Sequence, residues 1–449
     1  MDIEALAESV VKQAVKLGAS DCDVIVTDTQ AITAEIEKSS MKQASAVSDP
    51  GVGVRVFIKG CAGFSYCTGH ESQAVKQAVS LAVSQSKSGT PDLDFKGLPE
   101  KAKPAKVAGL YERKLAQLGH EDVVSMAIAI SDQAGADRRI TSVNAGVSVA
   151  LGDVALANSN GFVGYQKLSA FEAFAESVAK SNDDMFSGVD GGWSRRYDSK
   201  MLERIAETAK EHALLGLRKT TVKTGDYPVI LDPMAAGFIL VTALGGGANG
   251  ESVQRKRSFL AGRLGQKVGS ESFSVRDDPT IAWANGSFSF DGEGVPARKK
   301  NVVKKGMLES YLYDSYSAGK DSVKSTGNSS RGGSMWTYRR PPSISSTNLV
   351  VEPGDATLNE MLQDTKNGIY LRITYDYPNL ATGEFSGLMM ESYIIEKGEL
   401  GPSIRQASMG IDLIEMFSAI DLVGKEAKDA YGVRTPPIRI SKAKIAGSG

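Results

Sequence analysis

The sequence is short of the residues from which most metal sites and nucleophilic enzyme sites are built. Its 449 residues include only three histidines and three cysteines, and no cysteine follows Cys67. Histidines so few and so far apart leave little material for a zinc site or a Ser-His-Asp triad. Cys22, Cys61 and Cys67 all lie in the first 70 residues. We interpret them as small buried side chains in a reducing compartment rather than as metal ligands.

An excess of charge of either sign is also absent. Lys and Arg number 52 against 53 Asp and Glu, so the formal net charge is −1 and the pI is near 6.4. This balance argues against nucleic acid or an anionic membrane as a partner and favours proteins or small molecules. The first residues carry acids where a secretory signal has basic residues, and no apolar run approaches the length of a membrane span. We therefore expect a cytoplasmic protein.

The sequence does contain a succession of segments whose apolar residues recur with the period of a helix or of a strand. Apolar spacing typical of helices occurs at 3–17, 71–86, 121–134 and 199–217. Alternation typical of strands occurs at 23–37, 52–67, 141–161 and 166–177. The polar, turn-rich segment 218–228 is the best candidate for a domain boundary.

Strands dominate beyond that boundary, where residues 301–314 and 391–404 each predict a hairpin turning on Lys-Gly. Residues 357–365 predict a short helix and 368–377 another strand. The sequence therefore predicts an α+β protein with two domains. The first, residues 1–223, is an α/β domain with small antiparallel sheets and helices, which a division near 90–110 would split into two subdomains. The second, residues 224–449, is a β-rich, barrel-like domain.

Gly245, Gly247 and Gly250 match G-x-G-x-x-G, the pattern with which dinucleotide sites cradle a phosphate. Such a site needs a strand before the glycines and a helix after them. Residues 232–244 instead predict a helix that runs into the glycines, with Asp232 as its N-cap and Pro233 in its first turn. The polar residues that follow lack the apolar period of a helix packed under a sheet. A nucleotide site is therefore disfavoured.

Each histidine lacks the second histidine that a zinc motif requires. His70 and His120 precede a glutamate, as in a zincin helix, but no histidine follows one turn later. We interpret Thr68 to Glu71 as a helix capping box and the acids after His120 as first-turn charges. His212 lacks the earlier histidine of an inverted motif.

Two further patterns carry possible chemistry. Ser317 and Lys320 match S-x-x-K, in which a lysine activates a serine nucleophile, although a loop between strands is the interpretation we favour. Arg255, Lys256 and Arg257, beside the glycines, could hold a peptide carboxylate together with backbone amides. The basic run 297–305 is typical of a solvated strand face.

Seven segments, taken in order, resemble the TldD/PmbA family along essentially the whole chain. They are GVGVRVFIKGCAGFSYC, NSNGF, TGDYPVILDPMAAG, RKRSFLAGRLGQKV, FDGEGVP, LYDSYSAGKDSVKSTGNSSRG and ATGEFSG. The family has two branches: TldD, a metallopeptidase subunit, and TldE, also called PmbA, its metal-free partner.

The resemblance also indicates the branch. In TldD-type members the helix after Leu-Asp-Pro carries a His-Glu pair and a second His five residues on, ahead of a Gly-x-x-Gly-acid-x-x-x-Arg-Lys stretch. Matching that stretch to this sequence places the three metal-site positions at Val241, Thr242 and Gly246. None of these can bind zinc or act as a general base, and the cysteine that TldD uses near its C-terminus has no counterpart. The chain therefore resembles the TldE branch, with no catalytic or metal-binding residue of its own.

That resemblance implies a heterodimeric protease for unfolded or short peptides. A TldD-like subunit would carry the zinc-type metal and the chemistry, while this chain, without a cofactor, would complete an enclosed chamber. The loop expected to face the partner or the chamber contains Gly245, Gly247, Gly250, Glu251, Arg255, Lys256 and Arg257. Two alternatives stay open at this point: a homodimeric peptide-binding protein without TldD, and an autonomous hydrolase that uses Ser317 and Lys320.

Overall fold

The computed structural model describes residues 2–182, 184–333 and 335–449. In its N-terminal half, seven strands form one antiparallel sheet in the order β4-β3-β1-β5-β6-β7, and β2 pairs with the second half of β1. The strands are β1 (Asp21–Glu37), β2 (Ser40–Ser48), β3 (Gly51–Ile58), β4 (Cys61–Thr68), β5 (Ile140–Asn158), β6 (Val163–Ser181) and β7 (Asp184–Ser194). The small sheets expected from the sequence are thus parts of a single large one.

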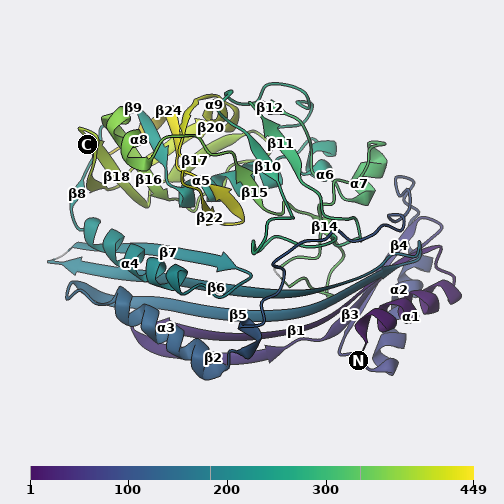
Figure 1. Ribbon diagram of the computed structural model, residues 1–449. Helices are drawn as coiled ribbons and strands as arrows, with labels where there is room; N and C mark the ends of the chain where they lie inside the picture. Colours follow the sequence, from purple (N-terminus) through teal and green to yellow (C-terminus); the bar gives the residue numbers. More distant parts are fainter. Residues whose placement is uncertain (1, 183, 334) are drawn as a thin grey trace.

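Alternation along the long strands gives this sheet two apolar faces. Odd-numbered residues of β5, such as Val147, pack against helices, whereas Val154 and Leu156 point to the opposite face. The helices on the first face are α1 (Ile3–Lys16), α2 (Ser72–Ser88), α3 (His120–Ala134) and α4 (Ser199–Leu215). The opposite face packs against Phe288, Phe290 and other residues of the C-terminal half, which lies above the curved sheet in Figure 1.

The helices and strands expected in this half are confirmed, but two strands were missed. All nine residues of β2 are exposed or half-buried, so its sequence has no buried face to reveal it. The sequence of β7 contains three glycines, a residue type depleted in strands. Gly188 is required there because a Cβ would lie 2.3 Å from the carbonyl oxygen of Ala209 in α4. The short helix η1 (Leu115–Gln117) was also not expected.

The C-terminal half contains two larger sheets and one small one. Nine strands form one sheet along the path β17-β20-β24-β9-β16-β18-β19-β8, with β21 attached to β24. Its members are β8 (Lys219–Thr220), β9 (Gly225–Leu231), β16 (Asn367–Ile373), β17 (Glu384–Leu388), β18 (Glu391–Glu396), β19 (Glu399–Ile404), β20 (Ser408–Asp412), β21 (Ile420–Val423) and β24 (Ile438–Ala446).

Six strands form the second sheet in the order β12-β11-β10-β15-β23-β22. They are β10 (Val275–Asp277), β11 (Lys300–Lys304), β12 (Met307–Leu308), β15 (Leu349–Val351), β22 (Lys428–Ala430) and β23 (Val433–Thr435), and β13 (Ser329–Ser330) pairs separately with β14 (Ser343–Ile344). The α+β class is confirmed, but over the described residues neither larger sheet closes on itself. The expectation of a barrel-like domain is therefore corrected to two open sheets that share one core.

Five helices and a wide turn accompany these sheets. They are α5 (Pro233–Leu240), η2 (Val241–Gly246), α6 (Gly250–Gln254), α7 (Ser315–Lys320), α8 (Leu358–Thr365) and α9 (Leu413–Ser418). Both predicted Lys-Gly hairpins are confirmed, because Lys305 and Gly306, like Lys397 and Gly398, have the positive φ angles of a tight two-residue turn. No helix among the described residues combines the length and apolarity that crossing a membrane requires.

Candidate functional site

The helix that carries the three metal-site positions lies in the core of the C-terminal half. Asp232 caps it by accepting a hydrogen bond from the Met234 amide at 2.8 Å, and Pro233 occupies its first turn. All eight residues of α5 are buried, with the shared core on one side and β22 and β23 on another. The predicted helix is confirmed, and its continuation η2 widens into a single π-helical segment before the glycines.

The residues at the three positions do not fit a zinc ion. Val241 offers only hydrocarbon, and Gly246 has no side chain. The hydroxyl of Thr242 donates to the carbonyl of Phe238 in the preceding turn, at 3.4 Å. Zinc sites in proteins use thiolate, imidazole or carboxylate ligands, and none is supplied here. Among the described residues there is also no group of three or more His, Cys, Asp or Glu side chains placed to hold a metal.

The glycines after η2 are explained by close packing. A Cβ on Gly247 would lie 2.2 Å from the Ala243 carbonyl oxygen, and one on Gly250 would lie 2.5 Å from the ring of Tyr313. A Cβ on Gly245 would lie 2.7 Å from the hydroxyl of Ser346. The short helix α6 begins only at Gly250, capped by Asn249, so the chain lacks the strand-glycine-helix order of a dinucleotide site.

Replacing Gly247 with Ala is expected to lower the free energy of unfolding by about 1–3 kcal/mol, because a backbone oxygen cannot move aside for the new methyl group. Gly246→Ala is the matched control. Its methyl group would meet the end of the Leu380 side chain, which can shift, so a change below about 1 kcal/mol is expected. Urea denaturation of both variants measures the difference, and equal losses would contradict this explanation of the glycines.

The basic residues beside the glycines are all exposed. Arg255 pairs with Glu251 one turn earlier in α6, at 2.7 Å, while Lys256 and Arg257 project from the following turn. An exposed pair of this kind contributes little to stability, so these side chains are available to a partner. The expectation that this loop faces a partner or a chamber stays a prediction.

The valine at the first metal-site position opens onto a groove between the two halves of the chain. Three hollows of about 610, 490 and 380 Å³ follow one another there and share lining residues. Trp193 borders the first two, and Asn285 borders the last two. Val241 lines the middle hollow. The helical segment that contains Val241 thus borders this groove.

Aromatic rings surround the middle hollow. Phe238 from α5 contacts Tyr377 and Tyr431 with ring centroids 4.8 and 5.3 Å apart, and Tyr431 in turn contacts Trp193 at 5.7 Å. Tyr377 keeps 69% of its surface exposed, which is unusual for a large ring in a monomeric protein. An exposed aromatic cluster beside a groove is typical of a surface that binds side chains of another chain.

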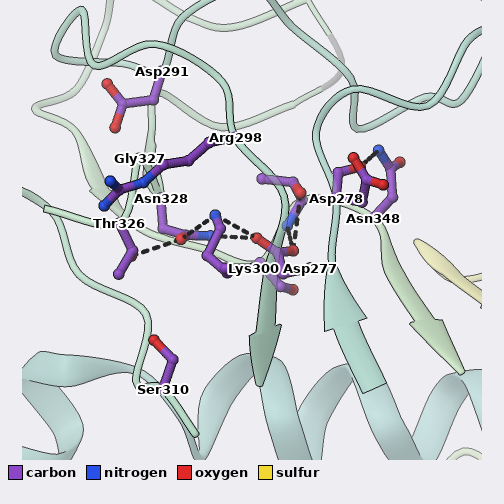
Figure 2. A network of polar contacts seen from close by, with 12 residues as sticks. Asp277, Asp278, Asp291, Arg298, Lys300, Ser310, Thr326, Gly327, Asn328 and Asn348 are labelled. Atoms are coloured by element: carbon purple, nitrogen blue, oxygen red, sulfur yellow. Dashed lines mark hydrogen bonds and ion pairs between the residues drawn. The ribbon is translucent and has the colours of Figure 1, made fainter. Parts of the chain in front are cut away.

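A network of hydrogen bonds supports the end of the groove (Figure 2). Asp277 on β10 accepts from Lys300 on β11 at 2.9 Å and from the Asn328 amide at 2.8 Å. Its other oxygen accepts from both the backbone and the hydroxyl of Thr347. Because Asn328 and Thr347 line the 380 Å³ hollow, this buried carboxylate fixes the wall of the hollow rather than facing into it. Lys300, which the sequence placed on a solvated face, is instead almost fully buried.

A buried ionic cluster joins the two halves. Asp23 on β1 accepts from Arg55 on β3 and from Arg331 of the C-terminal half, both at 2.5 Å, and Arg55 also donates to Glu293 at 2.8 Å. Burial disfavours ionisation of Asp23, but the two guanidinium groups outweigh it and lower its pKa. Nearby, burial together with the charge of Glu293 raises the pKa of Asp291 to about 7.

A second buried cluster joins the halves at the opposite end. Arg372 on β16 donates to both oxygens of Glu391 at 2.9 Å and lies 3.4 Å from Asp190 on β7. Glu391 also pairs with His212 of α4 at 2.8 Å. Burial alone would raise the pKa of Glu391, but Arg372 and His212 reverse this and lower it. His212 is therefore a partner of this cluster.

The other histidines have structural contacts. The ring of His70 lies 3.1 Å from the backbone oxygen of Thr27, and His120 is the exposed first residue of α3. The predicted capping box at Thr68 is wrong, because Thr68 ends β4, its hydroxyl lies 3.1 Å from that of Tyr338, and α2 begins after Glu71. The acids in the first turn of α3 are confirmed.

None of the three cysteines forms a disulfide. Cys22 and Cys61 are buried, and Cys67 is half-buried. Burial raises the pKa of the Cys22 thiol well above its ordinary value, with a smaller contribution from Asp23. A thiol held in its protonated form is unreactive, which agrees with the interpretation of small buried side chains.

Ser317 and Lys320 do not form a catalytic pair. They lie in the short helix α7 rather than in the loop expected, and the buried hydroxyl of Ser317 donates to Asp314 at 2.7 Å. Lys320 instead extends outward to Asp94, 2.7 Å away. A lysine that activates a serine must lie within hydrogen-bond reach of it. The autonomous hydrolase built on this pair therefore has no support in the geometry.

Sequence reasoning missed the residues that line the groove and join the halves. Trp193, Arg195 and Arg340 stand alone among unrelated residues in the sequence, and no spacing rule brings them together. The motifs FDGEGVP and NSSRG did carry a signal, since Glu293 and Arg331 belong to them and both meet the N-terminal sheet.

Comparison with known proteins agrees with this architecture. Three family models match in succession: PmbA/TldA metallopeptidase domain 1 at residues 22–86, the central domain at 113–217 and the C-terminal domain at 224–447. A metalloprotease of Methanocaldococcus jannaschii is 29% identical over 66% of this chain and 65% of its own length. The metalloprotease PmbA homolog of Haemophilus influenzae is 25% identical over 98% of this chain and 94% of its own.

A solved structure shows the same fold. The crystal structure of TldE from Thermococcus kodakarensis matches with a TM-score of 0.89 and 23% identity, covering 98% of this chain and all of that one. The matches by family model run through both halves of the chain and include the helix that carries Val241, Thr242 and Gly246. The chain therefore belongs to the PmbA/TldD metallopeptidase family.

Proposed function

We propose that this chain is a non-catalytic, TldE-like subunit that pairs with a TldD-like metallopeptidase to degrade or mature unfolded or short peptides. The observation that carries the proposal is the chemistry of Val241, Thr242 and Gly246, which offer no metal ligand in a chain of a metallopeptidase family. In this account the partner subunit carries the zinc-type metal, this chain carries no cofactor, and the complex works in the cytoplasm.

The groove supports a role beside the peptide. Its hollows are lined by aromatic and polar residues from both halves of the chain, and extended peptides bind such surfaces through their side chains and main chain together. The two buried ionic clusters fix the halves relative to each other, so the groove has a defined width before a peptide arrives.

Size-exclusion chromatography with a peptidase assay, using the chain alone and mixed with a TldD-like subunit, tests the proposal. We expect no cleavage by the chain alone, and a one-to-one complex that cleaves an unfolded peptide. Cleavage by the isolated chain, or a stable homodimer that excludes the partner, would contradict it.

Reversing the charges of the exposed loop, with Arg255→Glu, Lys256→Glu and Arg257→Glu together, is expected to weaken pairing or peptide cleavage by about tenfold or more. The reason is that the loop is exposed and continues the helix at the groove. Reversal of Lys12 and Lys16 on α1, which lies on the helical face of the N-terminal sheet, is the control and should change neither. If the loop variant pairs and cleaves normally, the loop does not face the partner or the chamber.

Ser317→Ala is expected to leave peptide cleavage by the mixture unchanged while lowering the free energy of unfolding by about 1 kcal/mol, through loss of the hydrogen bond to Asp314. Peptidase assays and urea denaturation of the same preparation measure both effects. Loss of cleavage with intact pairing would instead support the hypothesis that Ser317 is a nucleophile.

A further inference from the structure

The 380 Å³ hollow at the end of the groove contains two arginines without a carboxylate partner among the described residues. Arg195 and Arg340 both line it, together with Ser329 and four further hydroxyl residues, Ser343, Ser345, Ser346 and Thr347. By contrast, Arg55, Arg331 and Arg372, which join the two halves, each meet at least one carboxylate. The positive charges of Arg195 and Arg340 are therefore not neutralised by acidic residues of the described chain, and an anionic ligand could pair with them.

Arg195 is the more unusual of the two, because only 2% of its surface is exposed. Its guanidinium donates to three carbonyl oxygens, those of Ser169 at 3.0 Å, Asn285 at 2.7 Å and Ser287 at 2.9 Å. Its Nε–H has no partner among the described residues. Burial lowers the pKa of Arg195 to about 9, with no neighbouring acid to restore it. A buried cation held only by neutral dipoles is one that an anion would stabilise.

Arg340, an exposed residue that also lines the hollow, adds a second guanidinium. Its only hydrogen bond within the described residues goes to the Arg331 carbonyl, at a long 3.3 Å. It lies directly on Gly332, whose φ is +76° and whose Cβ, if present, would fall 1.2 Å from Nη2 of Arg340. Glycine at this position thus leaves the space that the guanidinium occupies.

Two residues that line the hollow each have a buried side-chain polar atom without a partner among the described residues. The hydroxyl of Ser329, a residue that is 1% exposed, makes no hydrogen bond, and neither does Oδ1 of Asn285. Buried polar atoms are nearly always paired, so unpaired ones that line a hollow indicate a missing partner. The hydroxyl of Ser329 can donate to an anion, whereas Oδ1 of Asn285 can only accept, so a ligand with both an anionic group and a neighbouring N–H group would complement the two residues.

The C-terminal residue of a peptide has both features: an anionic carboxylate and, next to it, a backbone N–H group. A phosphate ion near neutral pH also carries an O–H donor, but it has no side chain to occupy the adjacent aromatic hollow. Asn285 also borders the adjacent aromatic hollow, so the chain leading to such a carboxylate would pass Tyr377 and Tyr431.

We propose that the hollow between Arg195 and Arg340 binds the C-terminal carboxylate of a peptide lying in the groove. This proposal rests on the function proposed above, because that function makes peptides the ligands of this chain. It adds the class of peptide and its direction: free C-terminus at Arg195 and Arg340, preceding side chains among the aromatic rings.

Fluorescence polarisation with the full chain alone tests this. The probes are two fluorescein-labelled hexapeptides of alanine with one phenylalanine three residues before the end, one with a free C-terminal carboxylate and one with a C-terminal amide. We expect the acid to bind about tenfold more tightly than the amide. Arg340→Ala should remove this difference by weakening the acid alone, and an unchanged affinity for the amide shows that the variant is folded.

The neighbouring arginine provides the matched control. Arg339 pairs with Asp49 and does not line the hollow, so Arg339→Ala should preserve the preference for the acid. Equal affinity for the two peptides, no binding of either, or a preference that survives Arg340→Ala would each overturn the proposal. Displacement of a fluorescent anion by inorganic phosphate without any binding of the acid peptide would also overturn it, in favour of a phosphate site. Because no TldD-like subunit is present, failure here is distinct from failure to pair.

Discussion

Asp23→Asn is expected to lower the free energy of unfolding by about 3–5 kcal/mol, the largest loss we predict for any single side chain of the N-terminal sheet. The substitution keeps the shape of the side chain and removes its charge. Arg331, whose side chain is fully buried, would then have no ion-pair partner among the described residues and only neutral acceptors, such as the carbonyl of Gly292. Taking one ion out of a buried group leaves the opposite charge desolvated and uncompensated, which costs far more than the pair contributed.

Urea denaturation near neutral pH measures this loss, with Asp28→Asn as the control. Asp28 lies on the same strand, is exposed and forms no ion pair among the described residues, so a change within about 0.5 kcal/mol is expected. A similarly small effect of Asp23→Asn would mean that the cluster does not hold the halves together.

The same variant should show a characteristic dependence on pH. The pKa of Asp23 is lowered in the folded protein, so its contribution to stability is present above the unfolded pKa of about 3.9 and is lost as the pH falls through the folded value. The difference between wild type and Asp23→Asn should therefore be constant near neutrality and shrink only in strong acid. A difference that shrinks between pH 7 and 5 would point to another group.

Arg372→Met is expected to lower the free energy of unfolding of the wild-type protein by about 3–5 kcal/mol, because it leaves Glu391 and Asp190 buried with weaker partners. Asp190 keeps its ion pair with Arg204, and Glu391 keeps His212. The loss of stability should therefore be smaller than if every partner of these two carboxylates were removed.

A double-mutant cycle with Glu391→Gln separates this effect from a general loss of packing. Because Arg372 and Glu391 are in direct contact, the double variant should be more stable than the sum of the two single losses predicts, by about 1 kcal/mol or more. Strict additivity would show that the two residues do not act as a pair.

The sequence predicts the regular elements of this fold well where one face is buried, and poorly where it is not. The helix at 233–240 could be read from Asp232 and Pro233, because capping is local chemistry. The strand at 40–48 could not, since it forms only by pairing with β1 and buries almost nothing of its own. The joining of small predicted sheets into one depends on β1 pairing with both β3 and β5, which are separated by the 81 residues 59–139.

The candidate site divides in the same way. The loss of metal ligands at Val241, Thr242 and Gly246 could be found by resemblance alone, because a missing ligand is visible in sequence. The groove could not, since Trp193, Asn285 and Tyr431 come together only through the docking of the two halves. The packing roles of Gly245, Gly247 and Gly250 could not be predicted either, because they depend on contacts with Ser346, Ala243 and Tyr313 inside the folded C-terminal half.

Metal analysis of the isolated chain and of its complex with a TldD-like subunit tests the central claim most directly. The chain alone, after dialysis against zinc, should retain well below one equivalent of metal, and the complex should hold one equivalent per pair that is lost when the partner's metal-binding histidines are replaced. Val241→Ala and Thr242→Ala in this chain should leave the metal content unchanged, and Thr242→Ala, which does not line the groove, should also leave peptide cleavage unchanged. A full equivalent of metal on the isolated chain, reduced by either of these substitutions, would show that this helix is a working metal site.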